Sequence, residues 1–333
     1  MNKKRGLHFV LYISLCILMW STAAHAVTKV KLAHVFPETH AHHIAIEKYF
    51  KPYVEKHTNG DLIIEIYPNS QLGGERQCVE GLTIGTLQMA LSASSILTGF
   101  APEFQVFDLP YLFTNKEEVY KAVDGQFGQK LNALLPPIGI RNIAYIDSGF
   151  RAITNNKGPI EKPEDMHGLK IRVQENPLYI SLYRTLGASP VPINYGELYT
   201  ALQQKTVDGQ DQQIPLIYTN KFYEVQKYCS LTNITYTAAV LLVSEMWFQS
   251  LPEEYQNVLV EAGRICTNEQ RKLIKQQEGE CIRLLKDEGL VINDITPENK
   301  AAFINITKPV YKVFTDSVKD GQSYLDIIAT DIK

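Results

Sequence analysis

The fold is decided by the stretch VTKVKLAHVF at residues 27–36, together with the segments that follow it. Its polar and apolar residues alternate, which predicts a half-buried β-strand. Residues 40–60 then show an amphipathic helical pattern that ends at a glycine, and DLIIEIYP at 61–68 predicts a second strand. A further helix at 73–85 and a third strand at 87–94 continue the series. Strands that alternate with helices are typical of a parallel sheet covered by helices, so we expect an α/β fold.

A second series of strands and helices follows a long extended segment at residues 140–156. We expect this segment to leave the first domain, and we expect a second crossing within 223–236. Because no low-complexity linker separates the halves, the domains are predicted to exchange strands. The predicted division places a ligand cleft between two domains, which comprise residues 27–150 with about 238–277 and residues 151–237 with about 278–333.

The stretch from Leu251 to Gly289 has the pattern of one very long helix. Pro252 suits its first turn and Gly289 suits its end. About 36 helical residues at about 1.5 Å each give a length of roughly 54 Å, which exceeds what one domain of this size needs. We therefore expect the helix to lie across both domains. The alternative is two helices with a break near Thr267 and Asn268.

The N-terminus has the features of a secretory signal. Residues 3–5 are basic, an apolar run extends over 7–20, and residues 24–26 fit the small-x-small rule for cleavage. The alternative is an uncleaved membrane anchor, but the run is shorter than the roughly 20 apolar residues that a spanning helix needs. Residues 1–26 are therefore expected to form a cleaved signal peptide.

The formal net charge is −3, and loss of the three basic residues of the signal segment leaves −6. Because phosphate binding requires a basic surface, no nucleic-acid partner is expected. The spacings of the four remaining cysteines are typical of neither a metal site nor a redox motif. Buried thiols are the expected state of Cys78, Cys229, Cys266 and Cys281.

The sequence contains no GxSxG elbow, no P-loop and no HExxH motif, and no feature positively indicates an enzyme or a cofactor. His34, His40, His42 and His43 form a cluster that suggests a metal site, but their spacing alone is a weak sign of metal binding. We expect instead a solvated helix N-terminus without a metal.

Two arginines stand in otherwise apolar segments. Arg151 ends the expected crossing strand, and Arg172 lies in GLKIRVQ, a strand whose two faces should both be covered. On neighbouring strands at a domain border, two guanidinium groups would form a fork that pairs with a carboxylate or a sulfonate. The alternative is an internal salt bridge, for instance with Glu197 or Asp211.

Seven segments, in the same order, resemble the DctP-type periplasmic substrate-binding proteins of tripartite ATP-independent periplasmic (TRAP) transporters. They are YPNSQLGGER (67–76), FDLPYLF (107–113), GFRAITNN (149–156), PEDMHGLKIRV (163–173), LGASPVP (186–192), ELYTALQQKTVDGQ (197–210) and KFYEVQKYCSLTN (221–233). The resemblance covers nearly the whole mature chain. It implies a two-domain periplasmic-binding-protein fold, with crossing strands and a long helix spanning both domains.

The resemblance also implies a function. A monomer in the periplasm would clasp a small organic acid anion in the cleft and deliver it to a permease with small and large membrane subunits. Arg172 would grip the ligand carboxylate with two hydrogen bonds, and Arg151 would be a second anion contact. The other expected ligand-binding residues are Gln212, Glu75, Tyr195, Ser94, Ser95, Phe36 and Glu197.

The chain departs from the family pattern at three places. Gln212 stands where relatives have a ligand-contacting asparagine, Ile234 replaces a histidine, and Gln174 replaces a proline. Acid binding survives these changes, whereas the identity of the acid stays open. A glutamine reaches about one methylene further than an asparagine, which suits a smaller or displaced ligand.

Several functions remain open at this point. Glu75, Tyr195 and the two serines favour a hydroxylated acid, such as a uronate or a hydroxy or dicarboxylic acid. A small sulfonate such as isethionate would also fit an arginine fork. A secreted enzyme acting on uronates would need an acid and a base in the cleft, and no such pair stands out. A sensor subunit would use the same clasp as a transporter.

Overall fold

The computed structural model describes residues 27–333, so the expected signal segment at 1–26 lies outside the described residues. Ten strands form one continuous sheet, whose main path runs β2-β1-β3-β9-β4-β7-β5-β6, with β8 and β10 beside it. The strands are β1 (Thr28–Ala33), β2 (Leu62–Tyr67), β3 (Met89–Ala93), β4 (Ile140–Asn155), β5 (Lys170–Val173), β6 (Ser189–Pro192), β7 (Gly209–Gln213), β8 (Tyr228–Leu231), β9 (Tyr236–Ser244) and β10 (Val291–Asp294).

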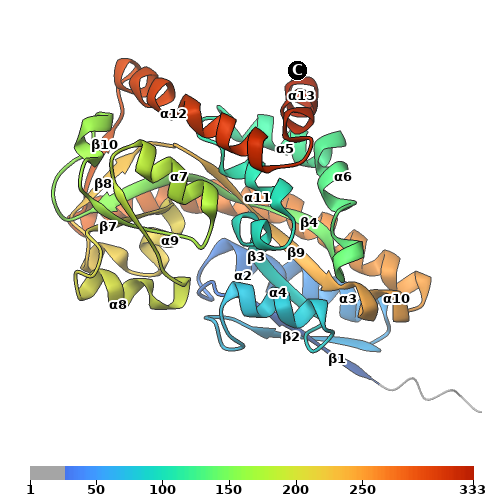
Figure 1. Ribbon diagram of the computed structural model, residues 1–333. Helices are drawn as coiled ribbons and strands as arrows, with labels where there is room; N and C mark the ends of the chain where they lie inside the picture. Colours follow the sequence, from blue (N-terminus) through green and yellow to red (C-terminus); the bar gives the residue numbers. More distant parts are fainter. Residues whose placement is uncertain (1–26) are drawn as a thin grey trace, which may run out of the picture.

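The first three strands confirm the pattern of residues 27–94, because β1 pairs in parallel with both β2 and β3. Helices cover this part and the second series of strands, as the α/β prediction requires (Figure 1). The helices are α2 (Ala41–Ala45), α3 (Lys51–His57), α4 (Glu75–Thr83), α5 (Lys116–Asp124), α6 (Gln126–Asn132), α7 (Pro177–Thr185), α8 (Leu198–Gln203), α9 (Ile214–Thr219), α10 (Glu245–Ser250), α11 (Glu253–Asp287), α12 (Pro297–Ser317) and α13 (Gly321–Asp331).

The long strand β4 joins the two halves of the sheet. Over residues 140–150 it pairs antiparallel with β9, which in turn pairs with β3. Over 151–155 it pairs with β7, which lies beside β5. The register with β9 shifts between Asp147 and Gly149, just before this change of partner. The strand that leaves the first half is therefore the predicted one, and an irregularity marks its crossing.

Helix α11 is one continuous helix of 35 residues, so the alternative of a break near Thr267 is wrong. It packs against α2, α3 and β4 and also against α9. In Figure 1 it runs behind the sheet as the orange helix from α10 toward the opposite side of the molecule. The expectation that it spans both halves is therefore confirmed.

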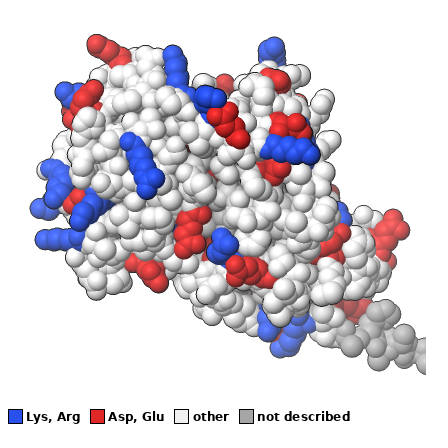
Figure 2. Space-filling model, viewed as in Figure 1, with Lys and Arg blue, Asp and Glu red and all other residues white. Residues whose placement is uncertain are grey.

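The predicted domain boundaries remain a prediction. Helix α12 packs against α7 in the second half, whereas the C-terminal helix α13 packs against α5 and α6 in the first. All four described cysteines are free and buried, as expected. Among residues 27–333, no helix is long and apolar enough to cross a membrane. Acidic and basic side chains are interspersed on the face seen in Figure 2.

One expectation is wrong. His34, His40 and His42 are each only 1% exposed, so the start of α2 is not a solvated helix end. The reason is that α2 is covered by α11, which the local sequence cannot indicate. Within the described part of the chain, no group of histidine, cysteine and acidic residues is arranged to hold a metal ion.

Candidate functional site

The Arg172 side chain carries a buried positive charge. It extends from β5, is 1% exposed, and donates from Nε to the Ile193 carbonyl at 2.9 Å. Its Nη1 has no hydrogen-bond partner among the described residues, and no described carboxylate forms an ion pair with it. Burial, and then the nearby Arg151, lower the pKa of Arg172 to about 10. An unpaired buried charge is costly, so Arg172 is a position where an added anion would be favourable.

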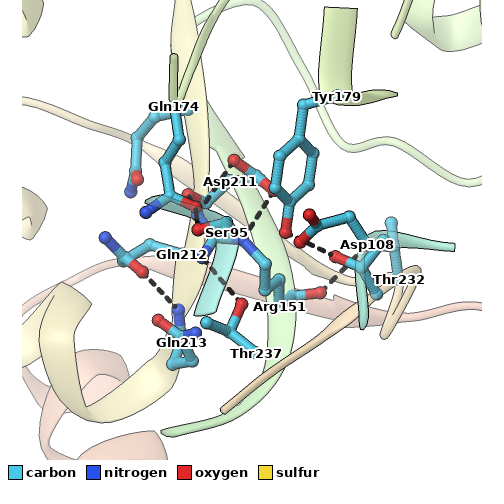
Figure 3. A network of polar contacts seen from close by, with 12 residues as sticks. Ser95, Asp108, Arg151, Gln174, Tyr179, Asp211, Gln212, Gln213, Thr232 and Thr237 are labelled. Carbon is cyan, nitrogen blue, oxygen red and sulfur yellow. Dashed lines mark hydrogen bonds and ion pairs between the residues drawn. The ribbon is translucent and has the colours of Figure 1, made fainter. Parts of the chain in front are cut away.

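The Arg151 side chain is also buried, but the protein itself satisfies it. Its Nε and Nη2 donate to the two carboxylate oxygens of Asp211 at 2.7 and 3.1 Å. Nη2 also donates to the Asp211 carbonyl, and Nη1 donates to Thr237 Oγ1 at 3.2 Å (Figure 3). Although burial opposes it, the Asp211 carboxylate raises the pKa of Arg151 above its usual value. The internal salt bridge is thus observed with Asp211 and not with Glu197.

The Glu75 carboxyl lies close to both guanidinium groups. It is the first residue of α4, it is 6% exposed, and its Oε1 accepts from the Ala93 amide at 2.7 Å. Burial raises the pKa of Glu75, while that bond and the two arginines act in the opposite direction. Glu75 is therefore a buried carboxyl that can form hydrogen bonds in the two cavities lined by Arg172 and Arg151.

Two small adjoining cavities lie at these residues, and they share Glu75, Gln174 and Tyr195 as lining. Arg172 lines one cavity, beside Ile193 and Asn194, and the Tyr195 ring centre lies 5.9 Å from its guanidinium carbon. The Arg151 cavity is lined by Phe36, Gln212, Gln213, Ser148 and Thr237, among other residues. The two guanidinium groups therefore do not lie in one cavity as the expected fork requires, because Arg172 lines one cavity and Arg151 lines the other.

Three expected ligand-binding residues do not line these cavities. Glu197 is exposed before α8. Ser94 and Ser95 are fully buried, and Ser95 Oγ donates to Gln174 Oε1 at 2.6 Å. Among the expected residues, the structure brings together Arg172, Arg151, Gln212, Glu75, Tyr195 and Phe36.

In the Arg151 cavity, sequence reasoning missed four polar lining residues, namely Ser148, Gln174, Gln213 and Thr237. For Ser148, Gln174 and Thr237 a sequence signal exists, because each is a polar residue within or directly after a strand that is rich in apolar residues. That signal does not distinguish a cavity from a buried hydrogen bond. Gln174, which replaces a proline of the family pattern, lines both cavities.

Polar contacts join the two halves of the molecule beside the cavities. Besides the bond from Ser95 to Gln174, Asn176 Nδ2 donates to Asp108 Oδ2 at 2.5 Å. Ser95 and Asp108 lie in the first half, between β3 and α5, whereas Gln174 and Asn176 lie between β5 and α7. Burial raises the pKa of Asp108 to about 8, although the bond from Asn176 and the charge of Arg151 oppose this. These contacts connect the two halves directly beside the cavities.

This geometry agrees with the comparison with known families. The family model described as bacterial extracellular solute-binding protein, family 7 (DctP), matches residues 32–317. The chain belongs to this family. The expected resemblance is thereby confirmed, and members of solute-binding protein family 7 bind their solutes rather than convert them.

Relatives of family 7 agree over almost the whole chain. The 2,3-diketo-L-gulonate-binding periplasmic protein YiaO of Escherichia coli is 31% identical over 98% of each chain. The sugar acid binding protein DctPAm of Advenella mimigardefordensis, solved with galactonate, is 30% identical with a TM-score of 0.89 and covers 92% of this chain and 99% of its own. A TRAP periplasmic solute-binding protein of Polaromonas, solved with D-erythronate, is 34% identical with a TM-score of 0.87 and covers 90% and 98%.

Proposed function

We propose that this family 7 protein is the periplasmic component of a TRAP transporter and binds a sugar acid that carries one carboxylate. The observation that carries the proposal is Arg172, a fully buried guanidinium whose Nη1 faces no acceptor within residues 27–333. A ligand carboxylate would provide the missing negative charge and accept from Nη1. Such charge-assisted bonds are short and strong in a site without water.

The charges that surround the cavities favour one carboxylate rather than two. Arg151 is neutralised by Asp211, so Arg172 is the buried guanidinium left for the ligand. The other arginine lining its cavity, Arg76, is exposed and paired with Glu80. A second carboxylate in the adjoining cavity would lie near Glu75. Glu75, Gln212 and Gln213 instead offer hydrogen-bonding groups that suit hydroxyls. The relatives that bind galactonate and D-erythronate carry ligands of this chemistry.

The remaining parts of the proposal concern the route of the ligand. The signal segment would be cleaved after Ala26, and the mature monomer would close on the acid in the periplasm. It would then release the acid, chemically unchanged, to the small and large subunits of a membrane permease driven by an ion gradient. The polar contacts between the halves support closure, because each joins one half to the other beside the site.

A thermal-shift screen of the chain from Val27 onward tests the proposal. The panel holds aldonates, uronates, C4-dicarboxylates, 2-oxo acids and sulfonates such as isethionate. A ligand at about 1,000 times its dissociation constant stabilises by roughly 4 kcal/mol, which shifts the melting temperature by several degrees. We expect shifts with aldonates or uronates. Shifts with dicarboxylates or sulfonates alone would contradict the proposed ligand class.

A further inference from the structure

We propose that Ser148 is a ligand-binding residue whose hydroxyl proton is directed into the cavity by a relay from Gln270 through His42. The proposal rests on the proposed function, since the ligand that accepts this proton is the sugar acid. The relay begins on the long helix α11, passes through the start of α2, and ends on the crossing strand β4.

The position of Ser148 follows from the irregularity in β4. The register between β4 and β9 shifts between Asp147 and Gly149, so Ser148 is the extra residue at this point. Gly149 has a positive φ of 101°, a conformation that side chains disfavour and glycine tolerates. Bulges of this kind turn a side chain out of the regular alternation of the strand. Ser148 thereby lines the cavity that Arg151 and Gln212 also line.

The first step of the relay is the orientation of the Gln270 amide. Its Oε1 accepts from the backbone amide of Asp147 at 3.1 Å, and its Nε2 donates to the carbonyl of the same residue at 2.7 Å. A flipped amide would place oxygen against oxygen and two donors against each other. The backbone of Asp147 therefore determines that the Gln270 NH₂ group, and not its oxygen, lies 3.1 Å from His42 Nδ1.

The second step is the tautomer of His42. An amide NH₂ group can only donate, so His42 Nδ1 must accept, and the neutral imidazole then carries its proton on Nε2. Burial lowers the pKa of His42 well below its usual value, which keeps the ring neutral. The rings of Phe36 and His40 pack edge-on against it, with centres 4.5 and 4.4 Å away. The ring is thus fixed in place and in its protonation.

The third step is the hydroxyl of Ser148. His42 Nε2 lies 2.9 Å from Ser148 Oγ and donates to it. The Ser148 oxygen accepts this bond on the side that faces His42, so its own proton points away from His42. Because Ser148 lines the cavity, we infer that the proton points into it. Thr237, opposite Gly149 on β9, is in the same situation because it accepts from Arg151 Nη1. The site therefore presents prearranged hydroxyl donors to ligand oxygens.

The test is calorimetric titration of the best acid from the thermal-shift panel into the wild-type protein and variants. For Ser148→Ala we expect about three- to tenfold weaker binding, the usual effect of losing one hydrogen bond. Ser244→Ala is the matched control, because Ser244 is equally buried on β9 and lines neither cavity. It should bind as the wild-type protein does.

His42→Phe keeps an aromatic ring against Phe36 and His40 but removes the donor to Ser148. As a positioning residue, His42 should matter only through Ser148, so His42→Phe should weaken binding in the wild-type background and add nothing in Ser148→Ala. A purely structural role would weaken binding equally in both backgrounds, and that result would overturn the relay. His42→Phe also removes the acceptor of one Gln270 N–H, but it does so in both backgrounds, so this loss cancels in the comparison.

The ring nitrogen chemical shifts of His42 provide a readout without ligand. The relay requires the Nε2-protonated tautomer, and finding the proton on Nδ1 would overturn it. If the wild-type protein binds the acid and Ser148→Ala binds it with the same affinity, the role of Ser148 is wrong while the proposed function stands. If the wild-type protein binds no sugar acid at all, the proposed function fails, and this inference fails with it.

Discussion

At the scale of single residues, the two buried arginines differ in how their positive charge is compensated. Arg151 has a carboxylate from its own chain, whereas Arg172 has only a carbonyl and the face of Tyr195. A buried charge that lacks a partner lowers stability. In this account the ligand supplies the partner that Arg172 lacks. A substitution of Arg172 that stabilises the unliganded protein should therefore weaken ligand binding.

Replacement of Arg172 by methionine should therefore leave the unliganded protein as stable or more stable. Removing a buried charge in favour of an apolar side chain is often neutral or stabilising by about 1–4 kcal/mol. Urea unfolding without ligand measures this. Arg141→Met serves as control, because Arg141 is paired with Glu245 at 2.7 Å and should lose about 1 kcal/mol or less. A loss of more than about 2 kcal/mol in Arg172→Met would show that the protein satisfies this charge by itself.

Replacement of Asp211 by asparagine should have the opposite effect. It leaves the Arg151 guanidinium buried without a counter-ion, and breaking a buried pair in this way costs about 3–5 kcal/mol. Asp316→Asn removes a partner from an exposed pair with Lys312 and should change stability by less than about 1 kcal/mol. Equal melting temperatures for the two variants would contradict the assigned role of Asp211.

At the scale of helices and strands, α11 holds the site by its contact with β4. Gly263 lies in α11, where an added Cβ would come within 2.9 Å of the Ile143 carbonyl oxygen and 3.2 Å of Ala144 Cβ. The missing side chain lets the helix lie directly on the strand that crosses between the halves. About two turns further along the helix, Gln270 reaches the backbone of the same strand.

Two glycines of α11 provide a matched pair of substitutions. Gly263→Ala should destabilise by about 1–3 kcal/mol, because backbone atoms must move to admit the methyl group. Gly279→Ala should stabilise by about 0.5–1 kcal/mol, since a Cβ there meets nothing within 4 Å and alanine favours the helix. Thermal unfolding of both variants compares them, and the same sign of change in both would contradict the close helix–strand contact.

The sequence predicts the elements well because each one depends on local periodicity. The parallel strands β1 to β3 and the unbroken α11 both followed from short-range patterns. The partner of Arg151 did not, since it depends on the register of β4 against β7. Arg151 lies opposite Gln213, which makes Asp211 its diagonal neighbour.

Burial of the start of α2 and the bulge at Ser148 depend on long-range packing as well. His42 meets Gln270 across 228 residues of sequence, and no local pattern reports such a contact. The two arginines stood out as charged residues in apolar segments, and the resemblance to family 7 added Gln212. It also suggested Glu197 and the two serines as ligand contacts, which the cavities do not include.

At the scale of the whole molecule, buried polar contacts join the two halves beside the site, and we interpret this arrangement as the closed form. Asp108 is fully buried at their junction, where it accepts from Asn176. Opening would expose Asp108 to water and return it to an ordinary acidic pKa, whereas the closed form holds the pKa at about 8. At a pH between these two pKa values, Asp108 is therefore protonated in the closed form and ionised in the open form.

We accordingly predict that ligand binding takes up about one proton at Asp108 near pH 6.5. Because the pKa is raised in the closed form, the contribution to affinity is fully present below the ordinary value and is lost as the pH rises through about 8. Calorimetry in two buffers of different ionisation enthalpy measures the uptake. Asp108→Asn should remove it, while Glu75, present in both proteins, cancels in the difference. Equal proton uptake by the two proteins would contradict this account of closure.

The central claim is that the Arg172 guanidinium holds the ligand carboxylate, and calorimetry with an acid and its uncharged counterpart tests it most directly. Galactonate and galactitol form such a pair. The account predicts that the wild-type protein binds the acid and not the polyol. It also predicts that Arg172→Met loses about 2–5 kcal/mol of binding free energy for the acid. Equal binding of acid and polyol, or unchanged affinity of the variant, would contradict the claim.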